Sequence, residues 1–169
     1  LASDKEKPVK RDYSLVIAPP APQRQSVAEM DAKSEGCNTC HVKTDAPTMH
    51  VSPAVRLGCT DCHGGDAKIV APGGLAATDA NYIKLRDDAH VLPMFPESWH
   101  FPSSANPKRS YTLMNKESPE FIRFMNPSDY RVVRDSCGAC HIETIEAAER
   151  SLMASGAMLW GGAGYNNGI

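Results

Sequence analysis

The chain has 169 residues, with 18 basic and 20 acidic side chains and a formal net charge of −2 at pH 7. This balance argues against nucleic acid as a partner, and the absence of any run of 18 apolar residues excludes a transmembrane helix. Leu, Ile, Val and Phe make up about 18% of the residues, so the chain has little aliphatic material for a core of its own.

Residues 1–25 are expected to form an extended segment. They contain the proline-rich stretch "APPAPQ", which cannot be helical and should run over the surface. The first residues lack an apolar core region, so they resemble a mature N-terminus after signal-peptide cleavage. The next stretch, "SVAEMDAKSEG", predicts a short helix with Ser26 as its cap, Glu29 three positions on, and Gly36 as its stop. We therefore divide the chain into the segment 1–25 and one domain over 26–169.

One five-residue pattern occurs three times, as "CNTCH" at 37–41, "CTDCH" at 59–63 and "CGACH" at 137–141, and it uses all six cysteines. The first two cysteine pairs also fit the spacing of a structural zinc site. Zinc, however, would leave the third pair without partners and the histidines unexplained. Chance would place a histidine after all three pairs with a probability of about 5 × 10⁻⁵, whereas C-x-x-C-H is the frame for attachment of c-type haem.

The haem interpretation explains each residue of the pattern. Two thiols on one helical turn form thioethers with the porphyrin, and the following histidine becomes the proximal ligand of the iron. The predicted attachment residues are Cys37, Cys40, Cys59, Cys62, Cys137 and Cys140, and the predicted proximal ligands are His41, His63 and His141. Because three porphyrins would supply the missing apolar volume, we expect a small multihaem cytochrome c fold. It should be mainly α with extensive coil and organised around three covalently bound haems.

The region between the second and third motifs is irregular, with paired glycines and several prolines; only "YIKLRDDAH" suggests a helical turn or two. Three further histidines, His50, His90 and His100, match the number of distal ligands that three six-coordinate irons require. Met49 and Met94 are the rival distal ligands. Ligation by two histidines throughout is the expectation that the count favours.

The last third of the sequence is the most regular. Ser118 and Pro119 predict the start of a helix over "EFIRFM", and "NPSD" at 126–129 predicts its end and the cap of another helix leading into the third motif. Apolar or small residues then recur at 142, 145, 148, 152, 156 and 159, which predicts one amphipathic helix that needs a surface to pack on. The ending "LWGGAGYNNGI" looks interrupted, so we expect a longer native chain or a larger assembly.

Several segments resemble the N-terminal region of large multihaem c-type cytochromes from anaerobic, often metal-respiring bacteria. They are "DAKSEGCNTCHVKTDAPTMHVSPAVRLGCTDCHGG", "DAHVLPMFPESW", "SANPKRSYTLMNKESPEFIRFMNPSDYRVVRDSCGACH" and "SLMASGAMLWGGAGYNNGI". The resemblance implies electron transfer at or outside the cell envelope, as part of anaerobic respiration, with the aligned motifs binding haem. His100 lies in "SWHFPSS", a stretch that does not match this pattern.

Three functions remain open. The first is electron transport through closely spaced haems, with other redox proteins as partners and no catalysis by the chain itself. The second is part of a reductase of nitrogen or sulfur oxyanions, with one open haem position. The third is a structural subunit of an extracellular cytochrome filament or envelope complex. Because thioether attachment of haem takes place outside the cytoplasm, we expect a periplasmic or extracellular protein under all three.

Overall fold

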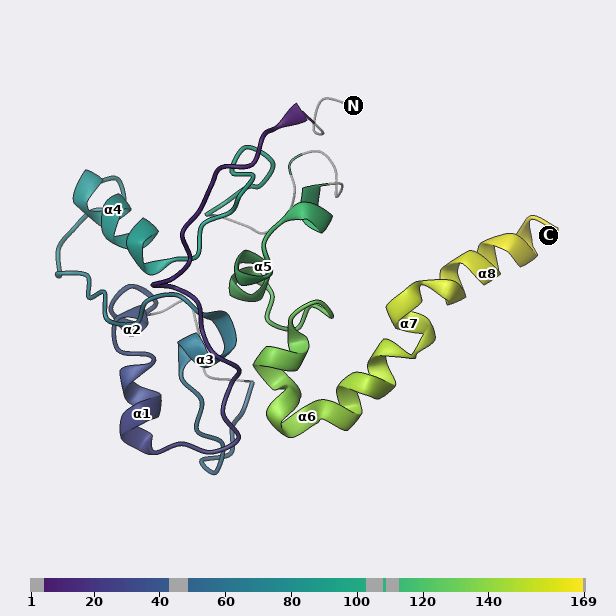
Figure 1. Ribbon diagram of the computed structural model, residues 1–169, viewed down its shortest axis with the longest axis horizontal. Helices are drawn as coiled ribbons and strands as arrows, with labels where there is room; N and C mark the ends of the chain where they lie inside the picture. The colour runs from purple at the N-terminus through teal and green to yellow at the C-terminus, as the bar shows by residue number, and fades with distance from the viewer. Residues whose placement is uncertain (1–4, 43–48, 103–107, 109–112, 169) are drawn as a thin grey trace.

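The computed structural model describes residues 5–42, 49–102, 108 and 113–168, and over these the chain is helical and coiled, without a β-strand. The mainly α class with extensive coil is therefore confirmed. Most of the molecule forms one body, and the end of the chain, from residue 151 to residue 168, leaves it as a helical arm (Figure 1). The elements are α1 (Val27–Ala32), α2 (Cys37–Cys40), α3 (Cys59–His63), α4 (Ala80–Ala89), the 3-10 helix η2 (Leu113–Lys116), α5 (Pro119–Met125), α6 (Val133–Glu149), α7 (Leu152–Ser155) and α8 (Ala157–Asn166).

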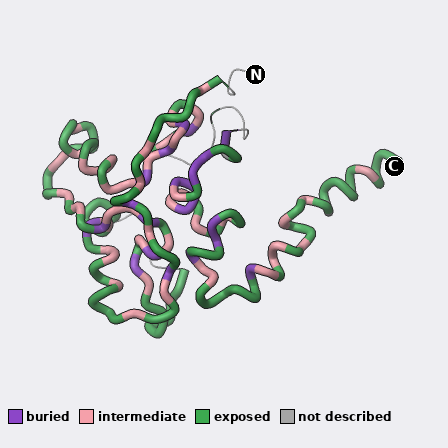
Figure 2. Tube along the Cα trace, viewed as in Figure 1, coloured by how far each residue is buried: buried purple, intermediate pink, exposed green. Residues whose placement is uncertain are grey.

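A small aromatic core holds the body together. Val16, Val91, Trp99 and Phe121 form its buried cluster, and the rings of Trp99 and Phe121 lie 5.6 Å apart. Figure 2 shows that buried positions gather on α5 and on the segments beside it. Its members come from three distant parts of the sequence, so this core fixes the position of the coil segment that contains His90 and His100.

A carboxylate is buried in this core. Glu117 is only 7% exposed and accepts hydrogen bonds from Trp99 Nε1 at 3.0 Å and from the backbone N–H groups of Met94 and Phe95. Several N–H donors are what a buried carboxylate needs in place of water. Glu117 therefore anchors the coil that follows His90.

The N-terminal segment is extended and lies mostly at the surface, as predicted, because most of its described residues are exposed. Val9 and Ala21 donate backbone hydrogen bonds to Met94 and Asp135, and Val16 accepts one from Gly65, at 2.7–2.8 Å. Val16 and Ala21 are buried. These bonds join the segment to three later regions of the chain, so it is attached to the domain at several points.

Two predicted helix starts are confirmed at the level of single hydrogen bonds. Ser26 and Glu29 form the expected capping box of α1, and Ser118 accepts from the N–H of Phe121 at the start of α5. Gly36, in contrast, does not act as the predicted stop, because α1 already ends at Ala32. Its φ is −65°, and its N–H donates to Ala67 O at 2.7 Å; a Cβ there would lie 2.2 Å from Ile69 O. Gly36 is needed for this close approach of two backbones.

Three other predicted elements differ in length or continuity. Helix α4 has ten residues instead of a turn or two, and α6 begins at Val133 after a series of turns that follows "NPSD". The predicted single helix after the third motif is wrong. Ser151 caps a new helix, α7, and Gly156 at φ +66° separates α7 from α8. Of the six predicted stripe positions only Ile145 is buried, so the stripe does not form one packed face.

Candidate haem-binding sites

All three Cys-x-x-Cys-His motifs lie on helical turns. The first occupies α2 with His41 as its C-cap, the second is α3 itself, and the third lies within α6, where His141 interrupts the helical dihedrals with φ −120° and ψ 23°. Residues three apart on a helix share one face, so each pair of thiols can reach one porphyrin. The cysteines are reduced, and each is partly or fully exposed: Cys37, Cys40, Cys59, Cys62, Cys137 and Cys140.

The fold brings the three motifs into one cluster with the second in the middle. Contact with the Cys37 thiol lowers the pKa of Cys59, and the same contact, together with burial, raises the pKa of Cys37. At the second thiol of α3, burial raises the pKa of Cys62, and the nearby Cys137 thiol adds to this rise. These shifts belong to the free thiols and disappear when thioethers form. What they establish is proximity: motif 1 lies next to motif 2, and motif 2 lies next to motif 3.

A buried ionic network fixes the middle motif against α1. Asp61, an intervening residue of "CTDCH", is 3% exposed and accepts from Lys33 Nζ at 2.6 Å and from Gln25 Nε2 at 2.6 Å. It also accepts from the N–H of Gly58 at 2.8 Å, which caps α3. The carboxylate therefore holds α3 at its first turn and ties it to α1, so the orientation of the attachment thiols is set before any cofactor is bound.

Two histidine pairs have the same separation. The rings of His41 and His90 have their centroids 6.2 Å apart, and the rings of His50 and His141 are also 6.2 Å apart. Each pair joins a motif histidine to one of the predicted distal histidines. The interplanar angles differ, at 44° and 19°, so the shared distance does not come from a shared stacking geometry.

This separation fits an iron bound between two imidazoles. A metal–nitrogen bond of about 2.0 Å and the distance of about 1.1 Å from a ring nitrogen to the ring centre place the two centroids about 6.2 Å apart. Burial, and then the nearby His41 ring, lower the pKa of His90 to about 4, so its ring is neutral, the form that binds metals. Its Nδ1 is also the one buried side-chain polar atom without a hydrogen bond among the described residues. These residues therefore fit the cofactor that the motifs predict.

The third motif histidine has a different environment. Nδ1 of His63 lies 2.7 Å from the carbonyl oxygen of Phe124, which can only accept, so Nδ1 carries the proton and Nε2 keeps its lone pair for a metal. The ring of Phe124 lies edge-on to His63 at 6.4 Å. His100 is exposed and lies outside both histidine pairs. Of the three predicted distal histidines, His50 and His90 therefore lie beside motif histidines. His100 belongs to neither of these pairs.

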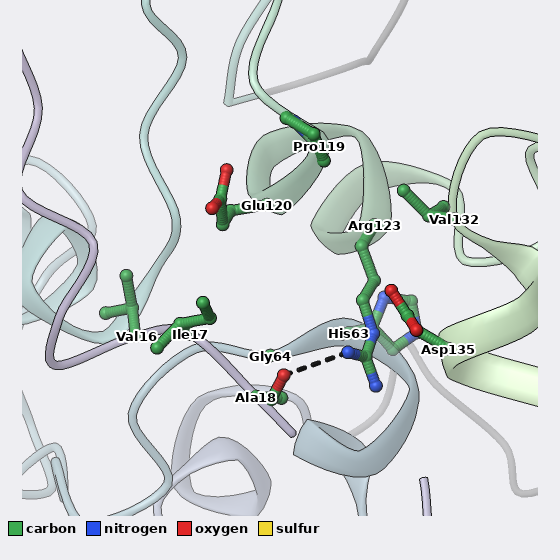
Figure 3. Close-up of a pocket in the computed structure, with 10 residues that line it drawn as sticks. All are labelled: Val16, Ile17, Ala18, His63, Gly64, Pro119, Glu120, Arg123, Val132 and Asp135. Atoms are coloured by element: carbon green, nitrogen blue, oxygen red, sulfur yellow. Dashed lines mark hydrogen bonds between the residues drawn. The ribbon is translucent and has the colours of Figure 1, made fainter. Parts of the chain in front are cut away.

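A small cavity of about 100 Å³ lies beside His63, and Arg123 from α5 lines it (Figure 3). Arg123 is 7% exposed, and its guanidinium donates to backbone carbonyls of the N-terminal segment and of α3. Sequence reasoning missed both Arg123 and Asp61. Asp61 could have been suspected from its place inside the motif, but Arg123 shows no pattern, since its partners are backbone atoms distant in sequence.

The zinc alternative has no geometric support. Among the residues that the structure describes, no three His, Cys, Asp or Glu side chains gather as ligands of one metal ion. Over the same residues, no helix combines the length and the apolar character that crossing a bilayer requires.

Comparison with known proteins adds no relative: no family model, curated protein or solved structure matches the chain significantly. The motifs and the arrangement of the histidines are therefore the evidence for the class of protein.

Proposed function

We propose that this chain is a c-type cytochrome that transfers electrons through three covalently attached haems. The observation that carries the proposal is the pair of imidazole couples, His41 with His90 and His50 with His141, both at 6.2 Å. Haem supplies one-electron redox chemistry at its iron. Two histidines on one iron leave no position for a substrate, so these two sites suit electron transfer better than catalysis.

The protein supplies attachment, ligands and their orientation. The cysteines of each motif would form the thioethers, and the motif histidines would bind the irons from one side. His90 would be the distal ligand of haem 1, attached at α2, and His50 the distal ligand of haem 3, attached at α6. For haem 2, attached at α3, the Phe124 carbonyl would hold His63 in the tautomer that presents Nε2.

The order of the motifs supports a conduit. Cys59 of α3 lies close to the first motif, and Cys62 of α3 lies close to the third. Haem 2 would therefore be the intermediate station between haems 1 and 3. The partners would be other cytochromes or redox proteins, in a periplasmic or extracellular setting, because thioether attachment requires export.

The reductase alternative concerns haem 2 alone. His63 belongs to neither imidazole pair, so an open or exchangeable position would be found at α3 and not at the other two motifs. A high-spin signal in the EPR spectrum that disappears when Cys59 and Cys62 are replaced by Ala, together with rapid reduction of nitrite or hydroxylamine, would favour this alternative.

The first test is the cofactor content. Intact mass should exceed that of the polypeptide by three haems, and a pyridine haemochrome assay should return the same number. The oxidised protein should have mainly low-spin spectra. A colourless protein, or one that contains zinc and has no Soret band, would refute the proposal.

The second test concerns ligand pairing. His90→Met should raise one midpoint potential and produce a methionine–iron band in the far-red spectrum of the oxidised protein. The band should be absent when Cys37 and Cys40 are also replaced by Ala, because haem 1 is then missing. It should persist when Cys137 and Cys140 are replaced instead.

His50→Met should give the reciprocal result, depending on Cys137 and Cys140 and not on Cys37 and Cys40. A His90→Met band that survives the loss of haem 1 would contradict the pairing. His100→Met is the matched comparison, because His100 lies outside both pairs and should leave haems 1 and 3 unchanged.

A further inference from the structure

Arg123 is a buried cation whose hydrogen bonds all go to neutral groups. Nη1 donates to Ala18 O at 3.0 Å and Nη2 donates to Pro19 O at 3.0 Å. Nη2 also donates to Asp61 O at 2.6 Å, and Nε donates to Cys62 O at 3.1 Å. The guanidinium thus joins α5 to the N-terminal segment and to two successive carbonyls of the middle motif.

No carboxylate neutralises this charge directly. Among the described residues, none of the ion pairs includes Arg123. Glu120 and Asp135 line the same cavity without pairing with it (Figure 3). The Asp61 carboxylate binds Lys33, and only its backbone oxygen faces Arg123. Burying a charge without a counter-charge is costly, so Arg123 is an unusual choice for a structural cross-link alone.

In the part of the chain that the structure describes, the cations near the other motifs are paired or exposed. Lys33, between α1 and the middle motif, is paired with Asp61 at 2.6 Å. Arg134, three residues before the third motif, is about half exposed and pairs with Glu149 at 2.5 Å. Their fields are largely cancelled by their partners or screened by water, whereas the field of Arg123 is not.

We infer that Arg123 raises the reduction potential of haem 2, the cofactor attached at Cys59 and Cys62. The inference rests on the proposed function and concerns one residue of it. Reduction adds one negative charge at the iron, and a fixed positive charge in a low-dielectric surrounding favours the reduced form. Arg123 donates a hydrogen bond to the carbonyl of Cys62, and the carbonyl of the next residue, Phe124, holds His63. The charge of Arg123 therefore acts more strongly on haem 2 than on haems 1 and 3.

Arg123→Gln tests the charge, because the amide still donates to a carbonyl. We expect the ferrous-to-ferric ratio of haem 2 at a fixed potential to fall about tenfold, a shift of about 59 mV for a one-electron couple. Haems 1 and 3 should shift less. Arg123→Lys keeps the charge with fewer hydrogen bonds, so the potential should stay near that of the parent protein even where stability falls. The measurement is a redox titration followed by NMR of the resolved haem methyl signals.

A second pair of variants leaves Arg123 in place. Ala18 lines the same cavity, and its carbonyl accepts from Arg123, so Ala18→Asp brings a carboxylate to the cation. It should lower the potential of haem 2, whereas the neutral Ala18→Asn should not. Arg134→Gln is the control for loss of an arginine near another motif, and it should leave haem 2 unchanged.

The inference is overturned if Arg123→Gln and Ala18→Asp leave the potential of haem 2 unchanged. It is also overturned if Arg123→Lys lowers that potential as much as Arg123→Gln, since the role would then be structural. A protein without haem at Cys59 and Cys62 by mass refutes the proposed function itself, and this result is distinct from an unchanged potential in a fully loaded protein.

Discussion

Asp61 shows how a single residue inside a Cys-x-x-Cys-His motif can stabilise the fold. Its carboxylate is 3% exposed, whereas the side chain of its partner Lys33 is 33% exposed. The same carboxylate caps α3 through Gly58. A hydrogen-bonded, buried charge of this kind is worth more than a surface ion pair, because removing it leaves donors without a partner.

Asp61→Asn should therefore lower the free energy of unfolding by about 2–3 kcal/mol. The matched control is Asp88→Asn, which removes the exposed pair with Lys84 on α4 and should cost less than about 0.5 kcal/mol. Denaturant titration of both variants followed by circular dichroism measures the difference. Equal losses would mean that the buried network contributes nothing beyond a surface ion pair.

At the scale of elements, two helix caps with the same local chemistry contribute differently to the fold. Ser118 and Ser151 both cap helices by accepting a backbone N–H three residues on. Helix α5 buries Phe121 and Ile122, whereas the described residues of α7 contain no buried side chain. The cap of α5 thus supports the core, and the cap of α7 supports only its own helix.

Ser118→Ala should lower global stability by about 1 kcal/mol, the usual cost of losing a helix cap. Ser151→Ala should leave the unfolding midpoint unchanged and only raise the hydrogen-exchange rates of amides in α7. The pair is informative because the local chemistry is the same. A global effect of Ser151→Ala would show that the arm is packed more tightly than its exposure indicates.

Across the whole molecule, the arm and the body are built differently. Leu152, Met153, Leu159, Trp160 and Tyr165 of the arm are between 62% and 84% exposed. The body contains the aromatic core, the buried ionic network and both histidine pairs. The arm leads away from this body toward the end of the chain (Figure 1).

Ending the chain after Arg150 should therefore leave the body intact. Its unfolding midpoint should change within the range of an ordinary surface substitution, about 0.5 kcal/mol, and its haem content should stay at three. Thermal unfolding monitored in the Soret region and intact mass provide the measurements. Loss of one haem on truncation would mean that the arm contributes to a cofactor site.

The central position of the middle motif leads to a prediction for electron exchange. Replacing Cys59 and Cys62 by Ala should slow exchange between haems 1 and 3, because the intermediate station between α2 and α6 is removed. Replacing Cys137 and Cys140 instead should leave exchange between haems 1 and 2 fast. Line widths in NMR spectra of the partly reduced protein report the rates. Unchanged exchange without haem 2 would place haems 1 and 3 in direct contact.

Several features of the protein depend only on local chemistry and could be predicted from the sequence. The three motifs, the caps at Ser26 and Ser118, and the mainly helical class depend on residues within one or two turns of each other, so spacing alone was sufficient to predict them. The number of histidines led to the expectation of paired ligation, which stays a prediction. It left open which distal histidine serves which motif, because a count contains no spatial information.

Two other features depend on the tertiary structure: which histidines lie side by side, and which cation is buried. His90 meets His41 across 49 residues, and His50 meets His141 across 91. The predicted helix after His141 failed at Gly156, where a left-handed backbone overrides the apolar periodicity. Arg123 acquired its place because four backbone carbonyls from two remote segments converge on α5. Backbone carbonyls are present at every residue, so only the folded chain selects the four that bind this cation.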